Sequence, residues 1–142
     1  MISITKIFRF ETAHAIFGYE GPCAHIHGHS YELHVRVAAE EQEQGYIDGT
    51  GIIIDFKDLK ALVQNAVIKK LDHKLVLSKD YLAATTNSFA NQEVVVFDAE
   101  PTAENLLIYI RKEIQNLFPK NIRLRALTLW ETRDSYAEWI AN

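Results

Sequence analysis

The chain of 142 residues contains a single cysteine, Cys23, and this scarcity limits its chemistry. One cysteine cannot form a disulfide within the chain, so the thiol is structural, reactive or metal-bound, and nothing marks an oxidising compartment. No run approaches the roughly 20 apolar residues of a membrane span, and the first residues contain no apolar signal core. We therefore expect a cytoplasmic protein without a membrane partner.

Positive charge is also scarce. Lys and Arg number 15 against 19 Asp and Glu, for a formal net charge of −4, and the basic residues are dispersed along the chain. A protein that binds the phosphate backbone of DNA or RNA gathers basic residues on one face. The charges therefore favour a small-molecule ligand and no nucleic acid. With 48% hydrophobic residues, the chain is long enough for one domain, residues 1–142, with a hydrophobic core.

Histidines, by contrast, are concentrated: three of the six lie within residues 25–29, directly after Cys23. Residues 2–14 and 30–37 alternate between apolar and polar side chains, which is typical of strands with one covered face. In this phase His14 continues the apolar face of the first strand. Extending the second strand backwards puts His27 and His29 on its apolar face. If the two strands pair antiparallel, the three imidazoles could converge on one point.

Three neutral imidazoles that leave a fourth position open form the usual site of a catalytic zinc ion. The spacing therefore predicts a metal site made by His14, His27 and His29. His25 has the same parity and could compete as a ligand. Cys23 would be a buried small side chain in most proteins, but here it lies in the segment leading to the predicted metal, where positive charge could stabilise a thiolate.

Two further sites carry groups suited to acid–base chemistry. Asp72 and His73 close the first predicted helix, and an acid beside a histidine can orient the ring and hold it protonated. The alternative is a helix-end pair that interacts with the helix dipole. Glu131 ends a predicted strand in phase with Leu127 and Leu129, so it would face the core side. A buried carboxylate needs a partner, which is either an arginine or a ligand with N–H donors.

The remaining pattern predicts an α+β fold. Asp55 is placed as the N-cap of an amphipathic helix, and Pro101 opens a second helix that extends to Leu117. Residues 78–92 lack periodicity and are expected to form a loop. Short strands are expected at 94–97, 124–132 and 136–140. Runs of strands framing two helices favour an antiparallel sheet covered on one face.

Six motifs, in order, resemble those of the 6-pyruvoyltetrahydropterin synthase and 6-carboxytetrahydropterin synthase family. They are Phe10-Glu11-Thr12-Ala13-His14, Cys23-x3-His27-Gly28-His29, Asp55-Phe56, Leu71-Asp72-His73-Lys74, Pro101-Thr102-Ala103-Glu104-Asn105 and Trp130-Glu131-Thr132. The resemblance spans nearly the whole chain. It implies a tunnelling fold, in which an antiparallel sheet with two helices on one face trimerises into a β-barrel. Two trimers would stack as a homohexamer with active sites between subunits.

The resemblance also implies a division of labour among the candidate residues. Zinc would be the cofactor, and it would coordinate the side-chain hydroxyls of 7,8-dihydroneopterin triphosphate. Its ligands would be His14, His27 and His29. Cys23 resembles the general base that removes a proton from the substrate side chain, and Asp72-His73 resembles a pair that shuttles protons.

Three more residues fall where the family binds the pterin ring. Glu131 resembles the carboxylate that anchors the amino-pyrimidine edge, and Thr102 and Glu104 match further pocket residues. The gap of three residues between Cys23 and His27 is similar to that of the bacterial 6-carboxytetrahydropterin synthases. The implied reaction is therefore that of a lyase on the route to 7-deazaguanine and queuosine, with acetaldehyde and triphosphate released.

Other functions remain open at this point. A 6-pyruvoyltetrahydropterin synthase would release triphosphate alone, and a paralogue on the same fold would act on a different pterin. A Cys-His-Asp hydrolase would use Cys23 as a nucleophile and keep its activity in the presence of a chelator. A non-catalytic, zinc-stabilised pterin-binding module would unfold when the metal is removed.

Overall fold

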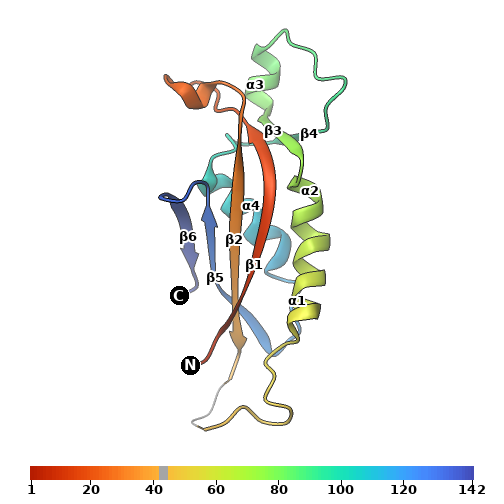
Figure 1. Ribbon diagram of the computed structural model, residues 1–142, viewed down its shortest axis with the longest axis vertical. Helices are drawn as coiled ribbons and strands as arrows, with labels where there is room; N and C mark the ends of the chain where they lie inside the picture. The colour runs from red at the N-terminus through yellow and green to blue at the C-terminus, as the bar shows by residue number, and fades with distance from the viewer. Residues whose placement is uncertain (42–44) are drawn as a thin grey trace.

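Two long strands form the centre of the fold. In the computed structural model, which describes residues 1–41 and 45–142, β1 (Ile4–His14) pairs antiparallel with β2 (His27–Ala39) along its whole length (Figure 1). Alternate residues of both strands are buried, as the sequence pattern predicts. The loop between them contains a short 3₁₀ helix, η1 (Pro22–Ala24).

Four more strands complete a sheet with the order β4-β3-β1-β2-β5-β6. On one side, β5 (Ile122–Trp130) pairs antiparallel with β2, and β6 (Tyr136–Ile140) pairs antiparallel with β5. On the other side, β3 (Lys74–Ser78) runs parallel to β1, and β4 (Val94–Phe97) runs parallel to β3. The expected antiparallel sheet is therefore a mixed sheet. Parallel neighbours need a long crossover, and helical segments supply it here.

Two local expectations for residues 74–92 are wrong. The sequence pattern predicts no strand at β3, where Leu75, Val76 and Leu77 are all buried and so show no alternation. It also places a loop throughout 78–92, whereas α3 (Lys79–Ala84) begins there, and the Ser78 hydroxyl accepts a hydrogen bond from a backbone N–H at its start. A helix of 6 residues is too short to show a helical period.

One long helical segment follows the connection after β2. It consists of α1 (Phe56–Val63), the π-helical η2 (Gln64–Ile68) and α2 (Lys69–Leu71). The carboxylate of Asp55 accepts the backbone N–H of Lys57 at 2.7 Å, which confirms the predicted N-cap. None of the helices in the described residues is long and apolar enough to cross a lipid bilayer.

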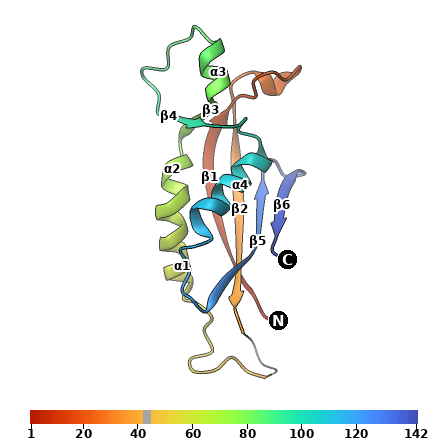
Figure 2. The ribbon, with the colours of Figure 1, turned by 180° about the vertical axis from the view of Figure 1, so that it is seen from behind.

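The second major helix, α4 (Ala103–Ile114), packs on the same face of the sheet (Figure 2). Its N-cap is Thr102, whose hydroxyl accepts the backbone N–H of Asn105 at 3.2 Å. The predicted extension to Leu117 is wrong, since the helix ends at Ile114 and the Leu117 side chain is exposed. The chain there turns toward β5 and leaves Leu117 outside the core.

The core lies between this face of the sheet and the two helical segments. The fully buried side chains that meet there include Leu33, Val35, Leu59, Val63, Leu106 and Ile110. The opposite face of β1 and β2 is polar, and Glu32 contacts both Arg9 and His34 there. The α+β fold with helices on one face is thus confirmed. The β1–β2 hairpin packs on this core, which supports the end of the hairpin.

Neighbouring isoleucines of α4 provide a test of this packing. Ile110 is fully buried and Ile108 is 51% exposed. We expect Ile110→Ala to lower the free energy of unfolding by about 2–5 kcal/mol, because it leaves a cavity in the core. Ile108→Ala should change it by about 0.5 kcal/mol or less. Urea unfolding followed by circular dichroism, at one protein concentration, measures both, and equal losses would contradict the described orientation of α4.

Candidate active site

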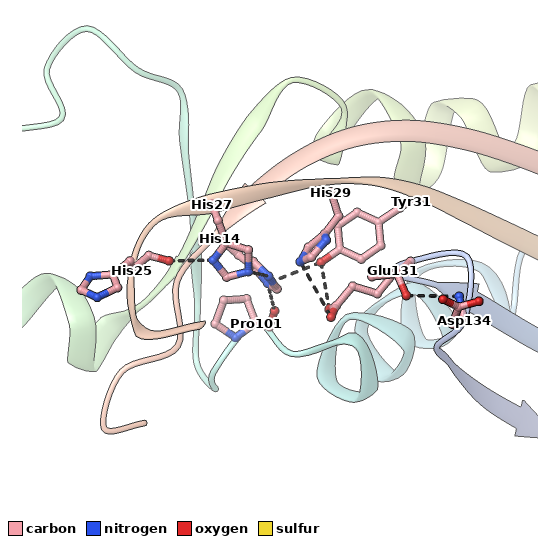
Figure 3. A network of polar contacts seen from close by, with 9 residues as sticks. His14, His25, His27, His29, Tyr31, Pro101, Glu131 and Asp134 are labelled. Atoms are coloured by element: carbon pink, nitrogen blue, oxygen red, sulfur yellow. Dashed lines mark hydrogen bonds and ion pairs between the residues drawn. The ribbon is translucent and has the colours of Figure 1, made fainter. Parts of the chain in front are cut away.

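Three imidazoles converge where the β1–β2 hairpin ends. His14, the last residue of β1, stands directly opposite His27, the first residue of β2, and His29 follows on the same face. The ring centroid of His14 lies 4.6 Å from that of His27 and 5.2 Å from that of His29. One ring nitrogen from each residue lies within 4.8 Å of the other two (Figure 3). The predicted convergence is confirmed.

Backbone carbonyls orient two of these rings. The Nδ1 of His14 lies 2.6 Å from the carbonyl oxygen of Pro101, and the Nδ1 of His27 lies 2.7 Å from that of His25. A carbonyl oxygen can only accept, so each Nδ1 carries the proton and each Nε2 of a neutral ring has a free lone pair. Such partners are typical of metal-binding histidines, because they fix the tautomer that presents Nε2 to the metal.

The two Nε2 atoms of His14 and His27 are only 3.0 Å apart. With both protons on Nδ1, these atoms are two acceptors that face each other without a hydrogen between them. Two facing lone pairs repel each other, and a cation bound to both removes the repulsion. The tautomers that the carbonyls select therefore fit a cation at this point.

The third ring gives independent support for a metal ion. The Nε2 of His29 is buried and has no hydrogen-bond partner among the residues that the structure describes, and the nearest carboxylate oxygen, Oε1 of Glu131, is 3.8 Å away. Burial lowers the pKa of both His14 and His29 below the usual histidine value, so the rings are neutral and able to bind a metal. A buried, unpaired nitrogen beside two others is a set of donors that suits a transition-metal ion. The chain therefore has a candidate metal site at the three predicted histidines.

The fourth candidate ligand, His25, does not join the site. Its side chain is exposed and its ring points away from the other three (Figure 3). Its carbonyl group instead holds the His27 ring. The competition expected from its parity therefore does not arise, because β2 begins only at His27 and the strand alternation does not reach back to residue 25.

Tyr31 and Glu131 lie directly against the histidines. The Tyr31 hydroxyl is 3.5 Å from Oε2 of Glu131 and 3.4 Å from Nδ1 of His14, and the Glu131 Oε1 is 3.8 Å from Nε2 of His29. Burial, together with the nearby Glu131 carboxylate, raises the pKa of Tyr31 far above its usual value. Tyr31 therefore stays protonated, and its hydroxyl donates a hydrogen bond to Oε2 of Glu131. Glu131 therefore lies on the predicted side of the sheet, although β5 ends at Trp130 and Glu131 follows the strand instead of ending it.

Beside the histidines lies a cavity of about 280 Å³. Five of the predicted site residues line it: His14, Cys23, Thr102, Glu104 and Glu131. Cys23 is exposed and lies in η1, so it is not the buried small side chain that most proteins would have. The aromatic side chains of Tyr19 and Tyr136 also line the cavity. A thiol, a carboxylate and a potential metal site thus face one space.

Asp72 and His73 are not among the residues that line this cavity. Oδ1 of Asp72 lies 3.0 Å from Nδ1 of His73 and accepts the backbone N–H of Glu11 at 2.9 Å. Slight burial opposes ionisation of Asp72, but these two contacts lower its pKa. The acid thus contacts the histidine ring, and Asp72 is also the C-cap of α2, so the pair lies at a helix end. His73 lines an open groove of about 640 Å³ that contains His29 but not Cys23.

Some contributors have little or no sequence signal. The carbonyl groups of Pro101 and His25 act through the backbone, so side-chain patterns cannot reveal them. Tyr31 could have been found, because it follows His27 and His29 at the same two-residue spacing on one strand face. The alternation alone predicts only an apolar position at Tyr31.

Comparison with known proteins identifies the family of the chain. Residues 3–141 match the family described as 6-pyruvoyl tetrahydropterin synthase, and the chain belongs to that family. It is 31% identical to the 6-carboxy-5,6,7,8-tetrahydropterin synthase of Rickettsia typhi, with 97% of this chain and 99% of the relative covered. The enzyme of the same name from Haemophilus influenzae is 27% identical, with 98% and 99% covered.

A solved structure gives the same result for the fold. The 6-pyruvoyl tetrahydropterin synthase of Plasmodium vivax superposes with a TM-score of 0.68 at 22% identity, with 100% of this chain and 99% of that one covered. The tunnelling fold implied by the resemblance is therefore confirmed for the single chain. The relatives are enzymes, and the chain is accordingly a 6-carboxytetrahydropterin synthase-like enzyme.

Two histidines of β2 allow a matched test of the metal site. We expect His27→Ala to weaken Zn²⁺ binding by more than about 100-fold, since it removes a ligand rather than a supporting contact. His34→Ala should bind as the wild type does, because His34 contacts Glu32 on the other face of the same strand. Titration with a competing chelator measures both affinities. Equal binding by the two variants would rule out the histidine site.

Proposed function

We propose that the chain is a zinc-dependent 6-carboxytetrahydropterin synthase. It would convert 7,8-dihydroneopterin triphosphate to 6-carboxy-5,6,7,8-tetrahydropterin with loss of acetaldehyde and triphosphate, in the pathway to queuosine and other 7-deazaguanines. The observation that carries the proposal is the pair of facing Nε2 atoms of His14 and His27, 3.0 Å apart beside a cavity that contains a thiol and a carboxylate. The names of the bacterial relatives support the choice of product.

The proposed metal site has the ligands that zinc requires. Three neutral histidines, His14, His27 and His29, would hold the ion. A zinc ion held there would supply Lewis acidity, which makes protons beside a polarised carbon–oxygen group more acidic. The chain's own contribution is to keep the His14 and His29 rings neutral by burial and to orient the His14 and His27 rings with backbone carbonyls.

Cys23 is the proposed general base. Its side chain lines the same cavity as His14 and Glu131, so a substrate that fills the cavity contacts all three. A thiol becomes an effective base when nearby positive charge stabilises the thiolate, and a bound metal ion is such a charge. Cys23 would take a proton from the substrate side chain rather than attack it as a nucleophile.

Glu131 is the proposed anchor for the pterin ring. A carboxylate can accept two parallel N–H bonds, and the amino-pyrimidine edge of a pterin offers two adjacent donors. Tyr31 holds one oxygen of Glu131 and so limits the rotation of the carboxylate. Thr102 and Glu104 form part of the cavity wall. The Thr102 oxygen accepts the N–H of Asn105, which leaves its proton free for a ligand.

The Asp72-His73 pair is proposed to serve the Cys23 site of another copy. Within one chain, His73 and Cys23 line different cavities. The assembly implied by the family resemblance, a homohexamer with sites between subunits, would bring them together. The homohexamer and the cytoplasmic location stay predictions.

One alternative product has direct support. The solved structure from Plasmodium vivax is named a 6-pyruvoyl tetrahydropterin synthase, so the same fold carries that activity in a protein 22% identical to this chain. A 6-pyruvoyl enzyme would eliminate triphosphate and keep the whole carbon side chain. The two activities therefore differ in whether a carbon–carbon bond breaks.

Identification of the products tests the proposal. We expect the zinc-loaded protein, incubated with 7,8-dihydroneopterin triphosphate, to yield 6-carboxytetrahydropterin and acetaldehyde, both identified by mass spectrometry. The 6-pyruvoyl product would favour the alternative, and intact substrate would contradict both. A chelator should abolish turnover; activity that survives chelation would point to a Cys-His-Asp hydrolase instead.

The Cys23→Ala variant serves as a control for this assay. It should keep its zinc, because Cys23 is not one of the three ligands, and lose turnover by about 10²–10⁴-fold, the usual contribution of a general base. Full activity of the variant would refute the base assignment.

A folded, inactive wild type that loses its structure without metal would indicate a zinc-stabilised binding module.

Mixed oligomers test whether the site is shared between copies. We expect Cys23→Ala and His73→Ala to be inactive when pure. When the two are unfolded, mixed equally and refolded, about one quarter of the interfaces should pair an intact Cys23 with an intact His73 and regain activity. Turnover of the mixture measures this. If the mixture stays inactive while refolded wild type recovers, both residues act within one chain.

A further inference from the structure

The loop that carries Cys23 has few internal constraints. It spans residues 15–26, between the last residue of β1 and the first of β2, and most of its side chains are exposed. The backbone N–H of Ile16 donates to the carbonyl of Cys23 at 2.9 Å, and two further backbone hydrogen bonds join residues 21–25 to one another. These contacts lie within the loop, whereas its place over the cavity also depends on contacts with other segments.

A carboxylate from a distant part of the chain does fix that place. Oε1 of Glu100 accepts the backbone N–H of Phe17 at 2.6 Å, across 83 positions of sequence. A hydrogen bond to a charged acceptor is shorter and stronger than one between neutral groups. Glu100 is itself held, because its carbonyl accepts the side-chain N–H of Asn105 at 2.9 Å. The loop is thereby tied to the first turn of α4.

Residues 100–102 form one short anchor for several parts of the active site. Glu100 holds the loop of Cys23, the Pro101 carbonyl holds the ring of His14, and Thr102 caps α4 while lining the cavity. The thiol and the first metal ligand are thus positioned from adjacent residues. A shift of the loop relative to this anchor would move Cys23 relative to the metal site.

We propose that Glu100 is a positioning residue, which holds the Cys23 loop over the cavity so that the thiol meets the substrate. The inference rests on the proposed role of Cys23 as the base. Proton transfer depends steeply on geometry, and a misplacement of about 1 Å can cost about 100-fold in rate. A loop freed from its tether would also open more often.

Three variants of the connection between β4 and α4 test this. Glu100→Ala removes the acceptor, whereas Glu100→Gln keeps an oxygen that can accept the Phe17 N–H without the charge. Asp98→Ala is the matched control, since it removes an exposed acid two residues away that forms an ion pair with exposed Lys79. Zinc content, kcat, KM and hydrogen exchange of residues 15–24 are measured for each.

Glu100→Ala should keep its zinc and lose about 10–100-fold in kcat, with a smaller change in KM, because the pterin anchor is untouched. Exchange within 15–24 should become about tenfold faster or more, as expected for loss of a hydrogen bond to a charged group. Glu100→Gln should recover kcat to within about fivefold of wild type. Asp98→Ala should behave as wild type.

Several results would overturn the inference. They are unchanged exchange in Glu100→Ala, faster exchange with unchanged kcat, loss of zinc together with activity, and failure of Glu100→Gln to recover kcat. The proposed function has its own failure, which is a wild type that does not turn over the pterin triphosphate. In that event, the exchange data alone still decide whether Glu100 holds the loop.

Discussion

The hydrogen-bonded ladder between β1 and β2 fixes which side chains meet at the end of the hairpin. Its register sets Phe8 against Leu33 and Phe10 against Tyr31, and the same register sets His14 against His27. A slip by one residue would turn the side chains of one strand to the other face. The packing of apolar residues under the helices therefore also selects the geometry of the candidate metal site, and the site needs no separate scaffold.

Burial at that end of the sheet also sets the protonation of the side chains. It keeps the His14 and His29 rings neutral and keeps the proton on Tyr31, which in turn holds Glu131. Core and candidate site are thus continuous: the row of β2 side chains on one face passes from buried aliphatic residues through Tyr31 to the partly buried His29 and His27.

Features that depend on regular alternation and on local capping could be predicted from the sequence. The phase of β2 placed His27 and His29 correctly, and Asp55 marked the start of α1. Alternation failed at β3, which is buried on both faces, and parallel pairing has no signature within a single strand. Contacts made by main-chain carbonyls, and the separation of His73 from Cys23, depend on the path of the whole chain and leave no pattern in its side chains.

The contact between His14 and the carbonyl of Pro101 makes one ligand of the site depend on a segment 87 positions away in the chain. Because the acceptor belongs to the main chain, no side-chain replacement at residue 101 deletes it directly. The ring is instead sensitive to where the N-terminus of α4 comes to rest. A folding intermediate with a complete β1–β2 hairpin but an undocked α4 would possess all three histidines and still lack a preorganised metal site. In such an intermediate, Nδ1 of His14 would lack the carbonyl acceptor that fixes the tautomer of the ring.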